Sequence, residues 1–148
     1  MERVSQIYTS DVREVGPIRE FVRNKCLEEW GDDPATADAI HLLALAVDEA
    51  ATNIVLHAYD RRAGQPIELV VECEPDEVAV SLIHQGRDFD PATVPPPSYD
   101  GSRTGGFGVW LIQEAVDQVE YRRADSGQCV VHLMKRRPRP SDPGGSTK

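Results

Sequence analysis

The chain has 148 residues, enough for one domain with a buried core, and 40% of them are hydrophobic, as is ordinary for a globular protein. Its 25 acidic and 16 basic residues give a formal net charge of −9, which disfavours binding to nucleic acid or to an anionic membrane surface. The cysteines Cys26, Cys73 and Cys129 are scattered without metal-binding spacing, so they indicate neither a disulfide framework nor a zinc site.

The N-terminal third of the chain predicts a strand followed by two helices. Residues 3–8 are typical of a short edge strand. Ser10 or Asp11 is a suitable cap for a helix that continues to about Trp30, with its apolar residues at helical spacing. Pro34 then begins a second helix, because proline is well tolerated in a first helical turn.

The second predicted helix contains an unusual row of polar residues. Glu49, Asn53 and His57 recur at every fourth position between residues 39 and 59, so an α-helix would place them on one face. The other sides are mostly Leu, Ala, Val and Ile, which predicts a largely buried helix. Two interpretations remain open: Glu49 faces a wet cleft, a metal or a ligand, or the row is a polar seam satisfied by neighbouring backbone.

The same polar positions bear on where the protein is found. They interrupt the longest apolar run of the chain, from which we expect no membrane-spanning helix. The N-terminus lacks the apolar core of a signal peptide. We therefore expect a cytoplasmic protein.

The middle of the chain predicts a hairpin and then a long loop. Apolar residues alternate with glutamates over residues 67–73, and residues 77–84 predict a second strand. The short turn at Pro75 and Asp76 makes this pair an antiparallel hairpin. Residues 86–106 are rich in proline and glycine, and a loop of that length is typical of a lid, a binding loop or a disordered segment.

The last part of the chain predicts one helix and one further hairpin. Residues 107–119 have helical periodicity, and residues 119–124 and 128–135 predict two strands joined by an Asp-Ser-Gly turn. The fold class expected from this order is α+β: a two-layer sandwich of a mainly antiparallel sheet with helices on one face. We expect a single domain over residues 1–136 and a disordered Pro/Gly/Ser-rich tail over residues 137–148.

Glycines stand immediately before the last predicted helix. Gly105, Gly106 and Gly108 would let backbone amides approach a ligand closely, and a helix N-terminus adds partial positive charge. These are the requirements of a phosphate cradle, although an ordinary turn has the same composition. Upstream, the second strand delivers His84 and Gly86 to the start of the long loop.

Three stretches together resemble the GHKL superfamily of ATP-binding domains, and in particular its small anti-sigma-factor serine kinases. They are DEAATNIVLHAYD at residues 48–60, HQGRDFDP at 84–91 and TGGFGVWLI at 104–112. The first looks like the N-box of the family, which is its most specific motif. The resemblance implies a Bergerat-type fold, ATP held beneath a mobile lid, and a protein as the phosphoryl acceptor.

The resemblance also implies roles for individual residues. Glu49 would be the catalytic base that accepts the proton of an acceptor serine. Asn53 would coordinate the Mg²⁺ that bridges the ATP phosphates. The remaining residues expected at the nucleotide are His57, His84, Gly86, Arg103, Thr104, Gly105, Gly106, Phe107 and Gly108.

At one position the chain departs from the family pattern. His84 stands where the family has an aspartate that accepts a hydrogen bond from the adenine amino group, and only one nitrogen of a neutral imidazole can accept. Two functional hypotheses follow. The first is a homodimeric protein-serine kinase that switches between a sigma factor and a STAS-type antagonist. The second is a binding module of the same fold that binds nucleotide weakly or not at all and acts by sequestering a protein partner.

Overall fold

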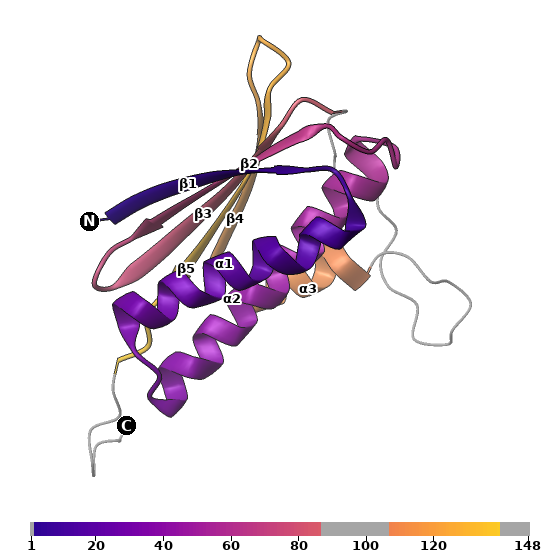
Figure 1. The fold of residues 1–148 in the computed structure, drawn as a ribbon. Helices are drawn as coiled ribbons and strands as arrows, with labels where there is room; N and C mark the ends of the chain where they lie inside the picture. The colour runs from indigo at the N-terminus through magenta and orange to yellow at the C-terminus, as the bar shows by residue number, and fades with distance from the viewer. Residues whose placement is uncertain (1, 87–106, 140–148) are drawn as a thin grey trace.

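The computed structural model describes residues 2–86 and 107–139, in which a five-stranded sheet is covered on one face by helices (Figure 1). The elements in chain order are β1 (Glu2–Thr9), α1 (Val12–Trp30), α2 (Pro34–Asn53), η1 (Ile54–Ala58), β2 (Pro66–Cys73), β3 (Glu77–His84), α3 (Phe107–Ala115), β4 (Gln118–Arg123) and β5 (Cys129–Arg136). The strand order is β1-β2-β3-β5-β4, and every neighbouring pair is antiparallel. The expected α+β sandwich, with residues 3–8 in an edge strand, is confirmed.

Helix α1 begins where the sequence predicts. The Asp11 side chain accepts a hydrogen bond from the Arg13 amide at 2.8 Å, which satisfies one of the donors left open at a helix N-terminus. The helix packs one face against α2 and the sheet. The residues buried on that face are Val15, Ile18, Val22, Cys26 and Trp30.

Helix α2 is the central element of the helical layer and changes character at its end. Asp33 caps it by accepting from the Thr36 amide at 3.2 Å. Beyond Asn53 the chain continues as the π-helical turn η1, in which the Tyr59 amide donates to the Ile54 carbonyl, five residues back, at 2.8 Å. The prediction of helical chain up to Tyr59 is therefore right in extent, but the prediction of α-helix throughout is wrong for the last turn.

The segment Pro34–Ala58 is long and apolar enough, by length and composition alone, to cross a membrane. In this structure 56% of its apolar 18-residue stretch is buried within the protein. The buried core helix of a globular protein can have the same length and apolar composition. The interrupting polar residues therefore do not exclude such a span by composition alone, and a single helix of this kind is weak evidence for a membrane span. The packing of this helix between α1, α3 and the sheet is that of a core helix in a globular protein.

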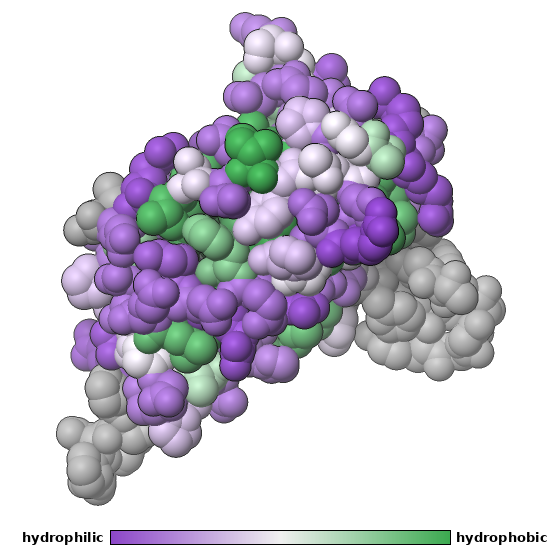
Figure 2. All heavy atoms as spheres, in the orientation of Figure 1, coloured by the Kyte–Doolittle hydropathy of each residue, from purple (hydrophilic) through white to green (hydrophobic). Residues whose placement is uncertain are grey.

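Successive side chains of each strand point to opposite faces of the sheet, and those on the helical side form the core. In the β2–β3 hairpin Ile67 lies opposite His84 and Val71 opposite Val80, and these side chains point toward the helices and are buried. The other side of the sheet has no helix on it in the described part of the chain (Figure 1). Hydrophilic side chains cover most of the helical face, with apolar ones in small separate groups (Figure 2).

Helix α3 is shorter than the sequence predicts. It ends at Ala115 rather than near residue 119, because Asp117 joins the chain to β5. The Asp117 amide donates to the Met134 carbonyl at 2.9 Å, and its carboxylate accepts from the Arg136 amide at 2.7 Å. Strand β4 then begins at Gln118.

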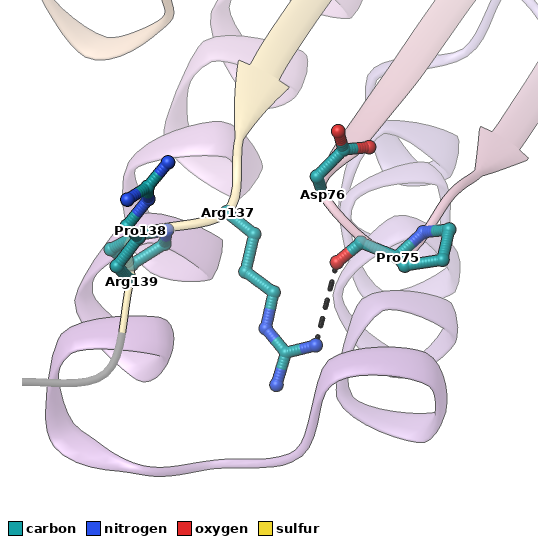
Figure 3. A pocket seen from close by; sticks show the side chains of 5 residues that line it. All are labelled: Pro75, Asp76, Arg137, Pro138 and Arg139. Atoms are coloured by element: carbon teal, nitrogen blue, oxygen red, sulfur yellow. Dashed lines mark hydrogen bonds between the residues drawn. The ribbon is translucent and has the colours of Figure 1, made fainter.

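The chain stays packed just beyond the expected domain end at residue 136. The Arg137 amide donates to the Asp76 carbonyl at 2.8 Å, and its guanidinium donates to the Trp30 carbonyl at 3.1 Å and lies 6.0 Å from the Trp30 ring centre. Arg137 lines a hollow of about 300 Å³ together with Pro75, Asp76, Pro138 and Arg139 (Figure 3). The rest of the expected tail, residues 140–148, lies outside the described residues.

Candidate active site

Two of the polar residues of α2 face the start of α3. A Cβ added to Gly108 would lie 2.8 Å from Oε1 of Glu49 and 3.7 Å from Oδ1 of Asn53. The backbone of the first turn of α3 therefore lies directly against a carboxylate and an amide that are more than fifty positions away in the sequence. Only glycine allows this approach without displacing one of the polar groups. The structure thus brings together Glu49, Asn53 and Gly108.

The environment of Glu49 suits a proton acceptor. Its side chain is half-buried between α2 and α3, and this burial raises the pKa of the carboxyl, with a smaller contribution from the neighbouring charge of Asp48. Asp48 in turn accepts a hydrogen bond from Arg19 of α1 at 2.7 Å. A carboxylate with a raised pKa is a stronger base than an exposed one, which is the property that general-base catalysis requires.

The end of β3 contacts the same helical segment farther along. A Cβ on Gly86 would lie 2.6 Å from the carbonyl oxygen of Ala58, the last residue of η1. His84 is 2% exposed, and its imidazole packs against the Tyr59 ring in a T-shaped arrangement with the ring centres 5.8 Å apart. The helix that contains Glu49 and Asn53 therefore also positions the point where the chain leaves the sheet.

The hydrogen bond of His84 changes what its ring can do. Nδ1 of His84 accepts from the Gly86 amide at 3.3 Å. A neutral imidazole that accepts at Nδ1 has its proton on Nε2, so Nε2 is a donor. In this tautomer the Gly86 amide occupies the only nitrogen of the neutral His84 ring that can accept a hydrogen bond.

The other residues expected at the site divide into three groups. His57 lies in η1 and is exposed. Phe107 is the first residue of α3. Arg103, Thr104, Gly105, Gly106 and the expected lid from residue 87 onward lie outside the described residues. Sequence reasoning assigned no role to Tyr59, although this residue lies in the N-box-like stretch of residues 48–60.

The site suits a magnesium ion that takes one ligand from Asn53 and the others from phosphate and water. Within residues 2–86 and 107–139, no group of three or more His, Cys, Asp and Glu side chains is arranged to hold a metal. Mg²⁺ bound with a nucleotide usually keeps waters and phosphate oxygens and takes only one or two ligands from protein. The side-chain oxygen of Asn53 is a hard donor of the kind it prefers, next to the Gly108 backbone.

A helical layer on an antiparallel sheet, with a carboxylate and an amide facing a glycine at a helix N-terminus, defines an ATPase-type domain of the α+β sandwich class. The chain belongs to the histidine kinase-like ATPase domain family, which matches residues 8–134. Membership of this family implies ATP binding.

Relatives of this chain have the names of protein kinases or of an anti-sigma factor. The chain is 35% identical over 101 residues to the serine-protein kinase RsbW of Halalkalibacterium halodurans, covering 62% of this chain and 60% of the relative. It is 29% identical over 109 residues to the anti-sigma F factor of Pasteuria penetrans, covering 70% and 72%. Three of these relatives are two RsbW kinases and the kinase BtrW of Bordetella bronchiseptica. The matched part of this chain spans only 58% to 61% of the length of each.

A solved structure supports the fold. The crystal structure of the RsbU and RsbW domains of Rv1364c from Mycobacterium tuberculosis matches with a TM-score of 0.64. The match covers 93% of this chain and 33% of that chain, at 17% sequence identity. At that identity the likeness establishes the architecture and leaves the chemistry to the site residues.

Proposed function

We propose that this protein is an ATP-dependent protein-serine kinase and anti-sigma factor, which binds a sigma factor and a STAS-type antagonist protein in turn. The names of its relatives and its family support this proposal. The observation that favours it most is the approach of Gly108 to both Glu49 and Asn53, since it joins the expected base, the expected metal ligand and a helix N-terminus. We further propose that the protein is cytoplasmic and acts as a homodimer.

Each residue of the cluster has a distinct task in this proposal. Glu49 would accept the proton of the acceptor serine as the serine oxygen bonds to the γ-phosphorus of ATP; the bond from that phosphorus to the bridging oxygen breaks, and ADP leaves. The amides of the first turn of α3, which include that of Gly108, donate to phosphate oxygens and add the partial positive charge of a helix N-terminus. Asn53 would hold Mg²⁺, which supplies charge neutralisation at the phosphates when bound.

One observation favours the second candidate, a binding module that sequesters its partner without phosphorylating it. In the tautomer described above, the Gly86 amide occupies the accepting nitrogen of His84, so the ring does not accept a hydrogen bond from adenine as the family aspartate does. If this mismatch abolishes nucleotide binding, partner sequestration is the function that remains. Measurement of nucleotide binding therefore separates the two candidates.

Nucleotide binding should be visible as thermal stabilisation of the isolated protein. A ligand present at 100 times its dissociation constant adds about 2.7 kcal/mol of stability, so Mg-ATP should raise the melting temperature by several degrees. The Asn53→Ala variant should lose most of this shift, because it removes the proposed metal ligand. A wild-type melting temperature that does not respond to Mg-ATP would reject the kinase in favour of the binding module.

Catalysis should be sensitive to a single methyl group on α3. In Gly108→Ala the new Cβ would overlap Oε1 of Glu49 at 2.8 Å, and the carboxylate is the flexible end of a side chain, so it moves away at little cost in stability. We expect phosphoryl transfer to a co-purified STAS-type partner to fall by about 100-fold, in line with the loss of a positioned base. Mass spectrometry of the partner serine would measure the rate.

Two results would contradict this reading of Gly108. Full activity of Gly108→Ala would show that the position of the Glu49 carboxylate is unimportant. Loss of the folded state would show that the contact supports the fold, as the polar-seam interpretation requires.

A further inference from the structure

Tyr59 links three elements through one buried hydroxyl. The residue is 1% exposed and follows directly after η1. Its hydroxyl donates to the Pro66 carbonyl at 2.6 Å, where β2 begins, and accepts from the Gln85 amide at 2.8 Å, one residue after the end of β3. A buried hydroxyl with both a donor and an acceptor partner is fully satisfied, and its removal leaves two backbone groups without a partner.

The ring of Tyr59 holds the same exit from β3 by packing. It packs against the imidazole of His84 in a T-shaped arrangement at an interplanar angle of 70°. Its Cδ1 is 3.0 Å from the place that a Cβ on Gly86 would occupy. One side chain therefore contacts each of the three successive residues 84–86, through a ring contact, a hydrogen bond and close packing.

The backbone of Tyr59 fixes this side chain to the end of the helix. Its amide closes the π-helical turn by donating to the Ile54 carbonyl at 2.8 Å. Its carbonyl accepts from the amide of Arg62 at 2.9 Å and from the Arg62 side chain at 3.2 Å. Since η1 continues directly from Asn53, the helix that contains the proposed metal ligand and the strand end that contains His84 are held at a set spacing by Tyr59.

We propose that Tyr59 is a positioning residue of the nucleotide site, which holds residues 84–86 in place relative to Glu49 and Asn53. This inference rests on the proposed function, because it assigns residues 84–86 to one wall of the nucleotide site and the end of α2 to the other. Tyr59 itself touches no reacting group. Its effect is on affinity for the nucleotide, since a displaced strand end alters the walls of the site before any chemistry occurs.

The variant Tyr59→Phe tests this role, because it keeps the ring and removes only the hydroxyl. Trp30→Phe is the matched control: Trp30 is buried, and its indole N–H donates to a backbone carbonyl, that of Glu74, at 2.9 Å. That bond lies at the other end of the helical layer, beside the connection between α1 and α2 (Figure 1). Both variants lose buried hydrogen bonding, and only one of them loses it at the strand exit.

Isothermal titration of Mg-ADP and steady-state kinetics would distinguish positioning from general stability. We expect Tyr59→Phe to bind Mg-ADP about ten-fold more weakly and to raise KM for ATP by a similar factor, with kcat within about two-fold of wild type. Trp30→Phe should lose thermal stability and keep wild-type affinity. The inference would be overturned if Tyr59→Phe bound Mg-ADP with wild-type affinity. It would also be overturned if Tyr59→Phe and Trp30→Phe lost the same amount of affinity for Mg-ADP.

Amide hydrogen exchange without nucleotide keeps this test separate from the proposed function. We expect the Gln85 amide to exchange at least about ten-fold faster in Tyr59→Phe and at the wild-type rate in Trp30→Phe. If the wild type binds no adenine nucleotide, the proposed kinase fails, and the exchange rates still decide whether Tyr59 holds the strand end. Unchanged exchange at Gln85 would reject the positioning role whatever the nucleotide result.

Discussion

Replacing Glu49 with glutamine should reduce the rate of phosphoryl transfer at least about 100-fold while leaving Mg-ATP affinity within a few-fold of wild type. Glutamine keeps the size of the side chain beside Gly108 but cannot accept the proton of a serine hydroxyl. Single-turnover phosphorylation of the partner protein would measure the chemical step, and calorimetry would measure binding.

The same substitution should not destabilise the fold. Burial, and to a lesser degree Asp48, raises the pKa of Glu49 in the folded protein above its unfolded value of 4.5. Between these two pKa values the folded state binds more protons than the unfolded state, so the contribution of Glu49 to stability falls as pH rises through that window. At neutral pH the ionised carboxylate is therefore a net cost, and Glu49→Gln should have a melting temperature equal to or above that of wild type.

Glu68→Gln provides the control for these measurements. Glu68 is a half-buried glutamate of β2 whose neighbours Ile67 and Leu69 point into the core, so its own side chain lies on the sheet face away from the helices. It should retain full activity. An active Glu49→Gln protein, or one that melts well below wild type, would support the polar-seam interpretation of this row.

Gly86→Ala should cost more stability than either Gly108→Ala or Gly16→Ala. The added Cβ would lie 2.6 Å from the Ala58 carbonyl oxygen, 2.7 Å from its carbon and 3.0 Å from Cδ1 of Tyr59. Two of these atoms belong to backbone, so no side-chain rotation relieves the overlap, and overpacking of this kind costs about 1–3 kcal/mol or more. Thermal unfolding should show a melting temperature lowered by several degrees.

Gly16→Ala is the matched glycine control. Gly16 lies inside α1, and a Cβ there would meet only a guanidinium nitrogen of Arg19, at 3.6 Å. Alanine in an α-helix is favoured over glycine by about 0.5–1 kcal/mol, so this variant should melt above wild type. Equal melting temperatures for Gly86→Ala and wild type would mean that the chain after β3 does not pack against η1 as described.

Local signals explain why most elements could be predicted. Asp11 and Pro34 mark helix starts through cap and first-turn chemistry, and the alternation after residue 66 predicts a strand because side chains point to opposite faces of a sheet. These rules act over a few residues. They miss changes that distant contacts impose, such as the early end of α3, where Asp117 bonds to β5.

The amino-acid sequence by itself determined the class of the fold, the family resemblance and the shared face of Glu49 and Asn53, because spacing within one helix sets which side chains point the same way. Only the tertiary structure decided that α2 packs between α1, α3 and the sheet, that it ends in a π-helical turn and that Gly108 faces those two residues. It also decided the position of Tyr59 between two strands and the hydrogen bond that occupies Nδ1 of His84. The physical reason is that each of these depends on contacts between segments far apart in the chain, which residue spacing does not record.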